Sequence, residues 1–405
     1  MKQKIVLAYS GGLDTSTIVP WLKENYDCEV HCVCVDVGQV APGEAEQIIE
    51  RAKKIGADSA VVADAVDELV EDYIWPMLKS GAVYEDKYLL GTSIARPLIA
   101  EKLVDRAKEI GADYIAHGAT GKGNDQVRFE LAIMALAPDI KVIAPWRIWD
   151  ITSREDAYAF CQKHGITLNV SLDESYSMDE NIWHLSHEGL DLEDPANVPK
   201  YDKILTLSQD PMKAPDEAVC ITIEFEKGVP VGVNGEKMKA AEIVRKLNKI
   251  GGENGIGIED MVENRVVGMK SRGIYETPGG TLLFKAHKQL EEMCLDRETS
   301  SFKRTVALKY ADLVYEGKWF GALREALDKF IDETQKHVTG KVGLKLYKGN
   351  IIPNGTFPEY SLYDKNIASF AMGDMFRPAD AEGFIRLYGL PLKIKALAEK
   401  NYEDK

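Results

Sequence analysis

A short run of residues near the start of the chain has the composition of an anion-binding loop. Ser10-Gly11-Gly12-Leu13-Asp14-Thr15-Ser16 follows an apolar run, Ile5 to Tyr9, and precedes a helical pattern that extends to Lys23. A loop between a strand and a helix presents successive backbone N–H groups, hydroxyls and the positive end of a helix dipole to one point. The glycines let the backbone approach the ligand closely. The run therefore predicts a phosphate site.

Neither of the common nucleotide-binding loops matches this run. It lacks the G-x-x-x-x-G-K-[ST] and G-x-G-x-x-G spacings, and no lysine follows its glycines. A glycine turn before an ordinary helix, with Ser10 and Asp14 as turn and cap residues, is the plainer interpretation. The full seven-residue string directly after a first apolar strand favours the phosphate site.

A second polar run, His117 to Phe129, follows the apolar run Tyr114 to Ala116. Its principal polar groups are Thr120, Asn124, Asp125 and Arg128. An aspartate can bind an ammonium group and an arginine can bind a carboxylate through two hydrogen bonds, so the set suits an amino acid. If both strands are parallel, the two runs face one crevice beyond the carboxyl ends of the strands. The alternative is a solvated glycine turn with Asp125 and Arg128 as a surface pair.

The first run, extended to Ala8, resembles the pyrophosphate loop of the N-type ATP pyrophosphatases, which split ATP between its α- and β-phosphates to form an adenylated intermediate. Within that superfamily it is similar to the first signature of the argininosuccinate synthase family. The second run fits that family's second signature, G-x-T-x-K-G-N-D-x-x-R-F, at every fixed position. The resemblance covers essentially the whole chain, and its other stretches are Tyr88 to Pro97, Ser177 to Ser186 and Val262 to Pro278.

This resemblance implies that the chain condenses L-citrulline with L-aspartate, uses ATP and releases AMP and pyrophosphate, as in arginine biosynthesis and the urea cycle. The ureido oxygen of citrulline is a poor leaving group, so AMP is attached to it before the aspartate amine attacks. A Mg2+ ion on the phosphates is expected, with protein ligands that the sequence does not identify.

The resemblance also implies three sets of site residues. ATP is expected at Ala8, Tyr9, Ser10, Gly11, Gly12, Leu13, Asp14, Thr15 and Ser16, with Val35 and Gly118. L-Citrulline is expected at Tyr88, Ser93, Asn124, Arg128, Ser177, Ser186, Glu263 and Tyr275, and L-aspartate at Thr120, Asn124 and Asp125. Asp14, Asn124 and Asp125 are expected to act in catalysis by positioning and charge stabilisation, since no matched residue is a cysteine or lysine nucleophile. Lys122 is a candidate phosphate contact.

The elements that position these loops form an α/β pattern in the first 165 or so residues. Apolar runs that predict strands are Ile5 to Tyr9, Val30 to Val35, Ala60 to Ala63, Tyr114 to Ala116 and Lys141 to Ala144. Helical patterns lie between them, at Glu44 to Ile55 and Arg96 to Ile110. This alternation predicts a doubly wound parallel sheet that forms a nucleotide-binding domain, residues 1–167. Thr152 and Glu155 fit a capping box that opens its last helix, which ends near His164.

A different pattern follows, and it predicts an α+β synthetase domain over residues 168–365. Its first part, Ser171 to Pro215, is irregular and polar. The regular elements expected after it are a hairpin at Cys220 to Phe225 and Val229 to Val233, helices at Met238 to Ile250, Thr281 to Tyr315 and Gly321 to His337, and extended runs at Val338 to Tyr347 and near Ile351. Residues 366–405 are predicted to form a C-terminal oligomerisation arm with an amphipathic helix, Ala379 to Glu399; docking on its own domain is the alternative. The family is typically homotetrameric.

Composition limits the classes of partner. A formal net charge of -15 disfavours a broad nucleic-acid surface, and the chain has no apolar stretch near the ~20 residues that span a bilayer and no secretion signal. We therefore expect small-molecule substrates, no nucleic acid, no membrane and a cytoplasmic location. The six cysteines include no CxxC pair, and Cys32 and Cys34 fall on one face of a predicted strand, as small buried residues would.

Three other functions compete with this interpretation. A tRNA-modifying enzyme with the same loop would need a cysteine relay or a basic surface, which this sequence lacks. An amidotransferase-coupled ligase would need a cysteine at position 2, which is Lys2. A non-catalytic nucleotide-binding protein of the same fold would bind ATP without turnover.

Overall fold

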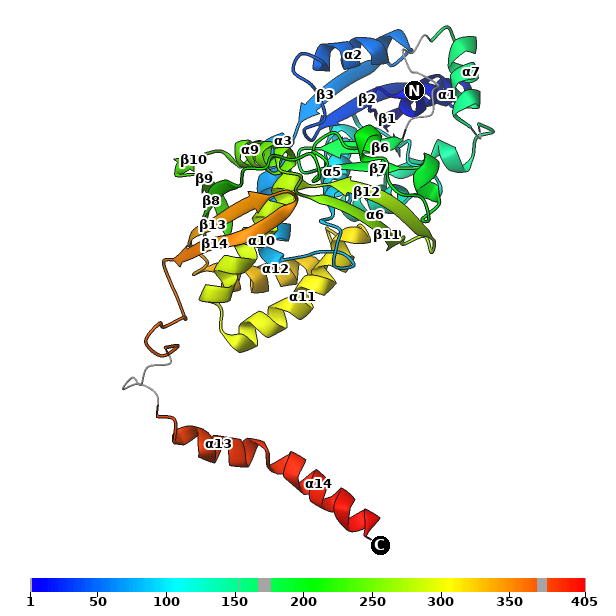
Figure 1. Ribbon diagram of the computed structural model, residues 1–405. Helices are drawn as coiled ribbons and strands as arrows, with labels where there is room; N and C mark the ends of the chain where they lie inside the picture. The colour runs from blue at the N-terminus through cyan, green and yellow to red at the C-terminus, as the bar shows by residue number, and fades with distance from the viewer. Residues whose placement is uncertain (1, 152, 167–175, 370–376, 405) are drawn as a thin grey trace. The chain divides into compact units, whose positions relative to one another are not determined.

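The computed structural model describes residues 2–151, 153–166, 176–369 and 377–404 (Figure 1). The chain divides into two compact units, Met1–Tyr360 and Ser361–Lys405. The predicted boundary after residue 167 falls outside the described residues, and the division into three domains stays a prediction.

A five-stranded parallel sheet lies in the first half of the larger unit. Its strands are β1 (Gln3–Ala8), β2 (Cys28–Asp36), β3 (Ser59–Asp64), β4 (Tyr114–Ala116) and β5 (Lys141–Ile143), in the order β3-β2-β1-β4-β5. Each matches a predicted strand. Along β1, Ile5 and Leu7 enter the core on one face of the sheet and Val6 enters the core on the other. Both faces are therefore covered, as in a doubly wound fold.

Helices cover this sheet on both faces. They are α1 (Leu13–Asn25), α2 (Ala45–Lys54), α3 (Val66–Glu68), the π-helix η1 (Leu69–Ile74), α4 (Trp75–Ser80), α5 (Gly91–Ile110), α6 (Asp125–Leu136), the 3-10 helix η2 (Pro145–Arg147) and α7 (Arg154–Lys163). α1 packs beside α7, and α5 packs on β1 (Figure 1). The capping box of α7 is formed by Ser153 and Asp156, one residue later than predicted; Thr152 lies outside the described residues.

The buried cysteines of β2 have the surroundings expected of core residues. Cys32 and Cys34 are 1% and 3% exposed and belong to the same core cluster as Ile5 and Leu7. Burial, followed by the nearby carboxylates of Asp36 and Glu44, raises the pKa of Cys34 to about 11. A thiol held in its neutral form is a poor nucleophile and a poor metal ligand.

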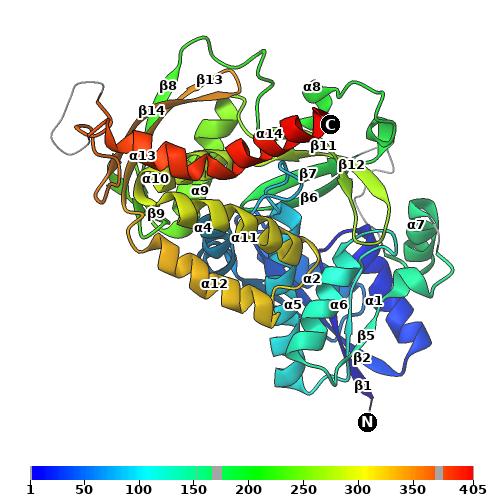
Figure 2. The same cartoon turned by 90° about the horizontal axis from the view of Figure 1, so that it is seen from below.

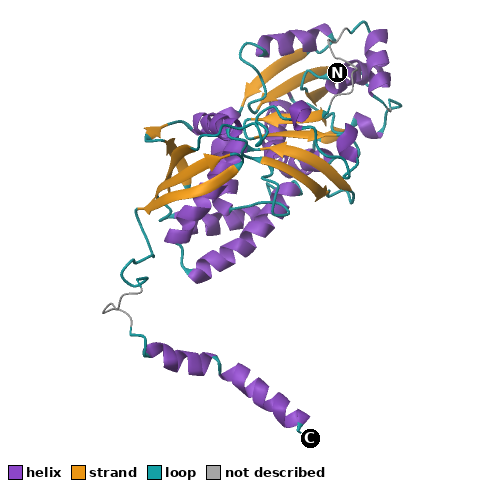
Figure 3. Ribbon diagram, in the orientation of Figure 1, coloured by secondary structure: helices purple, strands orange, loops and turns teal. Residues whose placement is uncertain are grey.

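Two antiparallel sheets make up the rest of the larger unit (Figure 3). One has the order β10-β9-β8-β13-β14, with β8 (Val219–Glu226), β9 (Val229–Val233), β10 (Glu236–Lys237), β13 (Gly340–Tyr347) and β14 (Asn350–Pro358). The other has the order β11-β12-β7-β6, with β6 (Ser177–Asn181), β7 (His184–Glu188), β11 (Ile258–Asn264) and β12 (Lys270–Glu276).

The hairpin of β6 and β7 corrects the prediction that residues 171–215 are irregular. Ser177 pairs with Glu188 and Asp179 with Ser186. These strands are rich in polar residues because one face of the hairpin lines a cavity, so the apolar alternation that marks a strand is absent. The prediction was therefore wrong for this segment.

Six further helices lie in this second half: the 3-10 helix η3 (Leu190–Glu193), α8 (Tyr201–Ile204), α9 (Ala240–Glu253), α10 (Pro278–Cys294), α11 (Arg297–Tyr315) and α12 (Ala322–Gln335). α9 packs on α10 and α11 on α12 (Figure 2). The single helix predicted over Thr281 to Tyr315 is wrong. The chain leaves α10 after Cys294, and Asp296 caps α11 by accepting from the backbone N–H of Thr299 at 2.9 Å.

The smaller unit contains α13 (Asp380–Tyr388) and α14 (Leu390–Glu403). The single helix predicted from Ala379 to Glu399 is therefore two helices, with Gly389 between them and Pro391 in the first turn of α14. None of the side chains described in these helices is buried. Among the described residues of the whole chain, no helix combines the length and apolar character needed to cross a membrane.

Candidate active site

The loop after β1 leaves the start of α1 open toward an anion. The N-cap residue is Gly12, which has no side chain that caps the first N–H groups of the helix. Ser10 Oγ lies 3.1 Å from Thr15 Oγ1, and Tyr9 OH lies 3.3 Å from Ser16 Oγ, so the hydroxyls form two bonded pairs within the loop. Backbone N–H groups and hydroxyls therefore gather at the positive end of the α1 dipole, as an anion site requires.

A cation lies beside this loop. Arg51 of α2 donates from Nη1 to the Gly11 carbonyl oxygen at 2.9 Å. Gly11 has a φ of +79°, and a Cβ there would approach Arg51 Nη1 to 3.2 Å. Glycine at this position therefore permits both the turn and the contact with the guanidinium, which supplies the positive charge that the sequence pattern lacks after its glycines.

The loops after β1 and β4 meet at one edge of the sheet. β1 and β4 are parallel neighbours, with Leu7 opposite Ala116. A Cβ on Gly118 would lie 3.2 Å from Thr15 Cγ2, so the loops are in contact there. The two strands are parallel neighbours at the point where the strand order reverses direction, as a shared crevice requires. That both runs face one crevice stays a prediction.

A cavity of about 260 Å3 adjoins these loops and gathers most of the predicted amino-acid site. The predicted residues in its lining are Tyr88, Gly118, Thr120, Asn124, Asp125, Arg128, Ser177, Ser186, Glu263 and Tyr275. They come from the β4–α6 segment, the β6–β7 hairpin, the β11–β12 hairpin and the segment before α5. The cavity is thus built by parts of the chain that are far apart in sequence.

Asp125 lies at the centre of a buried ion network in this cavity. Its carboxylate accepts from Arg96 Nε and Arg128 Nη1, each at 2.9 Å, and Arg96 Nη2 also donates to Asp179 at 2.7 Å. Burial by itself would raise the pKa of Asp125, but Arg96 and Arg128 outweigh it and hold this pKa below its ordinary value. Asp125 and Arg128 therefore do pair, but inside the cavity rather than on the surface.

Three other charged groups face the same space. Arg265 donates from Nη2 to Glu188 at 2.6 Å, and the Tyr275 hydroxyl donates to Glu263 at 3.1 Å. Burial raises the pKa of both Glu188 and Glu263 above the ordinary value, although a neighbouring arginine opposes the rise in each case. Burial likewise raises the pKa of Tyr88 to about 12, so its hydroxyl stays protonated at neutral pH.

Asn124 is held on both sides of its amide. Its Oδ1 accepts from the backbone N–H of Val266 at 2.9 Å, and its Nδ2 donates to the Tyr315 hydroxyl at 2.9 Å. Arg265 Nη1 also donates to the Lys122 carbonyl oxygen at 3.3 Å. The turn between β11 and β12 is therefore bonded to the loop that precedes α6, which fixes one wall of the cavity against another.

Besides the loop of Ala8 to Ser16, three predicted residues lie outside this lining. Ser93 is fully buried in the first turn of α5, one residue after Thr92, which lines the cavity. Val35 packs in the core, and its carbonyl oxygen accepts from Gln39 Nε2 at 2.8 Å. Lys122 is exposed and does not line the cavity. The roles of these residues, like those of the lining residues, stay predictions.

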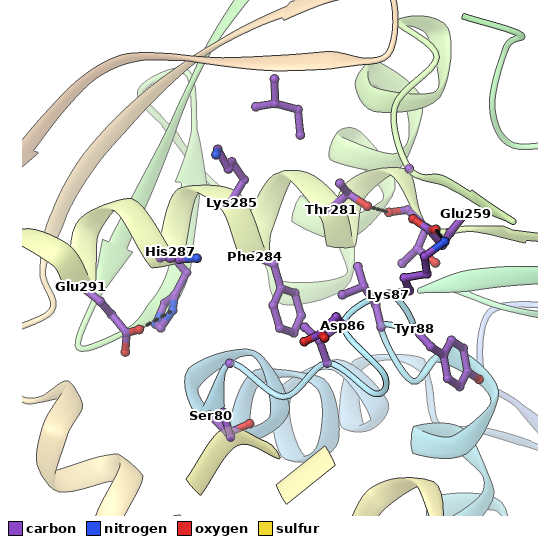
Figure 4. Close-up of a pocket in the computed structure, with 18 of the residues that line it drawn as sticks. Ser80, Asp86, Lys87, Tyr88, Glu259, Thr281, Phe284, Lys285, His287 and Glu291 are labelled. Carbon is purple, nitrogen blue, oxygen red and sulfur yellow. Dashed lines mark hydrogen bonds and ion pairs between the residues drawn. The ribbon is translucent and has the colours of Figure 1, made fainter. Parts of the chain in front are cut away.

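A larger pocket of about 610 Å3 lies on another side of Tyr88 and Tyr275. Figure 4 shows part of its lining, in which Phe284 of α10 points toward Asp86 in the segment from Ser80 to Tyr88, and Lys285 points away from that segment. Of the predicted site residues, only Tyr88 and Tyr275 line it. The smaller cavity is therefore the better candidate for the site, because it contains the loop residues on which the prediction depends.

No role was predicted for Arg51, Arg96, Asp179, Arg265 or Tyr315. Arg96, Asp179 and Arg265 lie in the stretches that carry the family resemblance, which was the available signal. Arg51 and Tyr315 lie in ordinary helical patterns and gave no signal. In the described parts of the chain, no cluster of three or more His, Cys, Asp or Glu side chains is arranged to hold a metal ion.

The whole length of the chain is similar to known proteins. Residues 4–167 match the family model described as the arginosuccinate synthase N-terminal HUP domain, and residues 176–395 match the arginosuccinate synthase C-terminal domain. An argininosuccinate synthase of Lachnoclostridium phytofermentans is 59% identical over 408 residues, which is 99% of this chain and 100% of that protein.

Two further relatives carry the same name. The Agathobacter rectalis protein is 59% identical over 407 residues, which cover 100% of this chain and 99% of that protein. A Clostridium botulinum protein is 60% identical over 393 residues, which cover 97% of this chain and 96% of that protein. Similarity of this extent leaves no long segment of either chain unmatched.

Proposed function

The chain belongs to the argininosuccinate synthase family, and from this we propose that it joins L-citrulline to L-aspartate at the expense of ATP, giving argininosuccinate, AMP and pyrophosphate. The observation that carries the proposal is the cavity beyond β4, which contains the lining residues of the second signature and adjoins the loop of the first. The tRNA-modifying and non-catalytic alternatives are not favoured, because the named relatives match over nearly their full lengths.

The first chemical step is adenylation of citrulline. The ureido oxygen attacks the α-phosphorus of ATP, an O–P bond forms, and the bond to the β-phosphate breaks with loss of pyrophosphate. The loop of Ser10 to Ser16 would bind the phosphates through its N–H groups and hydroxyls, and the Arg51 guanidinium beside Gly11 would balance charge on the departing pyrophosphate. The described residues offer no metal-ligand cluster, so we assign no protein ligand to Mg2+, which we expect to arrive with ATP.

The second step forms the new carbon–nitrogen bond. The amine of aspartate attacks the activated carbon, AMP leaves with the former ureido oxygen, and the nitrogen loses a proton. In this proposal the ammonium and carboxylate groups of both amino acids are oriented by Thr120, Asn124, Asp125 and Arg128 on one wall, and by Ser177, Ser186, Glu263 and Tyr275 on the other. Orientation of two bound reactants is the main source of rate, since the residues provide no covalent intermediate.

The two amino acids must share the cavity without an excess of one charge. Its lining carries the carboxylates of Asp125, Asp179, Glu188 and Glu263 and the guanidinium groups of Arg128 and Arg265, and Arg96 lies directly behind. Four acidic groups near three basic groups leave a small negative balance that suits the ammonium groups of the substrates.

The test is the dependence of ATP cleavage on both amino acids. With the enzyme in catalytic amount, AMP and pyrophosphate are expected to accumulate equally over many turnovers, and only when citrulline and aspartate are both present. Omission of either amino acid, and replacement of citrulline by ornithine, which lacks the ureido oxygen, are the controls. Cleavage of ATP that is insensitive to both amino acids would refute the proposal.

We further propose that the enzyme is a homotetramer whose C-terminal unit joins the subunits. The support is the apolar surface of α13 and α14, where Phe384, Leu387, Tyr388, Leu392 and Leu397 are all more than half exposed. Apolar side chains in such a row are typical of a surface that another copy of the chain covers.

A further inference from the structure

Tyr315 touches the candidate site from behind. It is the last residue of α11, it is 1% exposed, and it is not among the residues that line the cavity. Three residues that do line the cavity, Asn124, Arg128 and Glu263, interact with it. Any effect of Tyr315 on a bound amino acid must therefore pass through these neighbours.

The Tyr315 hydroxyl determines how Asn124 presents its amide. It accepts from Asn124 Nδ2 at 2.9 Å. On the other side, the Val266 N–H donates to Asn124 Oδ1. With the oxygen bonded on one side and one amide hydrogen bonded on the other, Asn124 has its second N–H for a ligand, so it offers a donor to a carboxylate or a carbonyl.

The ring and main chain of Tyr315 hold Arg128. Arg128 Nε donates to the Tyr315 carbonyl oxygen at 3.0 Å, and the guanidinium carbon lies 4.9 Å from the centre of the ring. Gly317, with a φ of +77°, lets the chain pass so close that a Cβ there would be 2.7 Å from Arg128 Cα. The end of α11 therefore fixes the direction in which Arg128 can bond a ligand.

We propose that Tyr315 is a positioning residue that orients Asn124 and Arg128 for the two amino-acid substrates. The inference rests on the proposed function. It adds a residue that links the cavity residues expected to bind citrulline with those expected to bind aspartate. The proposal also predicts that the Tyr315 hydroxyl affects the binding of some substrates and not of others. Binding of both amino acids depends on the Tyr315 hydroxyl, whereas ATP binding at the loop after β1 does not.

The first test is Tyr315→Phe, which removes the hydroxyl and keeps the ring and the main-chain contact with Arg128. The KM values for citrulline and aspartate are expected to rise about fivefold to tenfold, because the Asn124 amide loses the acceptor that orients it, and the KM for ATP is expected to change less than twofold. The matched control is Tyr310→Phe on the same helix, whose buried hydroxyl donates to Asp328 at 2.8 Å and does not contact the cavity residues. It is expected to leave all three KM values within twofold.

The inference is overturned if Tyr315→Phe leaves both amino-acid KM values within twofold, if the KM for ATP rises by the same factor, or if Tyr310→Phe has the same effect. A second measurement isolates Asn124. Aspartate binding is measured by calorimetric titration with citrulline present, for Asn124→Ala with and without Tyr315→Phe. We expect Tyr315→Phe to weaken binding less than twofold when Asn124 is already alanine. If it weakens binding as much as it does in the unaltered enzyme, Tyr315 does not act through Asn124. Loss of citrulline- and aspartate-dependent AMP release by the unaltered enzyme would instead refute the proposed function.

Discussion

Arg51 shows how a single side chain can supply what a loop sequence lacks. The loop after β1 has glycines and hydroxyls but no lysine of its own, and the guanidinium that reaches Gly11 comes from α2. A cation fixed by a hydrogen bond to the loop both holds the backbone in place and attracts a polyphosphate. Its effect belongs to the ATP site and is independent of the amino-acid cavity.

Replacement of this guanidinium is expected to weaken ATP binding selectively. Arg51→Gln should raise the KM for ATP about fivefold, which corresponds to about 1 kcal/mol, and leave the KM for aspartate within twofold. Steady-state kinetics with each substrate varied in turn measures both. Arg106→Gln on α5, where Arg106 pairs with exposed Glu109, makes the same change in net charge away from the loop. Equal ATP KM values for the two variants would contradict the prediction.

Some residues of the candidate site could be predicted from the sequence, and others could not. The glycines and hydroxyls of Ser10 to Ser16 are contiguous in the sequence, so this segment alone was enough to predict a phosphate site. Asp125 was expected to bind a ligand ammonium, but it shares both oxygens with Arg96 and Arg128. No local pattern identifies Arg96 as a partner 29 residues away, and the same holds for Tyr315, 191 residues from Asn124.

At the scale of elements, β7 joins the antiparallel sheet to the helices of the first half of the chain. His184 on β7 is fully buried, with Nε2 3.3 Å from Thr92 Oγ1 and Nδ1 3.3 Å from Thr277 Oγ1. A Cβ on Gly91, the first residue of α5, would lie 2.1 Å from His184 Cγ. The imidazole therefore occupies the junction of β7, α5 and the residue that precedes α10.

Burial of this imidazole makes the junction sensitive to acid. Burial, followed by the nearby side chains of His187 and Arg96, lowers the pKa of His184 to about 3. The pKa of this imidazole is about 6.5 in the unfolded chain. Above pH 6.5 it is neutral in both the folded and the unfolded chain, so its lowered folded-state pKa does not reduce the free energy of unfolding. As the pH falls below 6.5 the free energy of unfolding decreases, because His184 binds a proton in the unfolded chain but stays neutral in the folded chain. Stability is therefore lost between pH 6.5 and pH 3.

Unfolding by urea at pH 7.0 and pH 5.5, at one protein concentration, measures this loss. His184 is expected to account for about 1 kcal/mol of the decrease in the free energy of unfolding between these two pH values. His184→Gln should reduce the decrease by that amount, whatever its effect at pH 7.0. His337→Gln, at an exposed position, is the control and should keep the full decrease. An unchanged decrease in His184→Gln would be evidence against the assignment.

Elements were predicted where local pattern and burial agree. The five parallel strands read as apolar runs, so all were identified. The β6–β7 hairpin was not predicted because its polar residues line a cavity and so break the apolar alternation of a strand. Helices α10 and α11 were predicted as one helix because the break at Leu295 and Asp296 contains neither glycine nor proline. Tertiary requirements override local propensity at such places.

The whole molecule consists of two units that differ in how they bury apolar surface. The unit of residues 1–360 contains the core clusters and the candidate site, whereas no described side chain of α13 or α14 is buried. Helices of 9 and 14 residues without a buried face are marginal by themselves in water. Association with other copies of the chain is the arrangement that would stabilise them.

We therefore expect removal of residues 377–405 to reduce the proposed homotetramer to a smaller assembly, as measured by light scattering. Ile394→Ser with Leu397→Ser, which alters the apolar side of α14, should act in the same direction. The control is Lys395→Ser with Glu399→Ser, which removes an exposed ion pair of 3.6 Å from the same helix. An unchanged molar mass after the deletion would refute the oligomerisation role.

The distance in sequence between Arg128 and Tyr315 also sets an order in time. A ribosome extends the chain by about 5 to 20 residues per second, so the 187 residues between these two positions take roughly 10 to 40 s to synthesise. The parallel sheet and its phosphate loop are complete once β5 has emerged, but Arg128 and Asn124 have no Tyr315 to orient them until α11 follows. If this loop binds phosphate as proposed, a nascent chain completes its nucleotide-binding loop well before its amino-acid cavity exists.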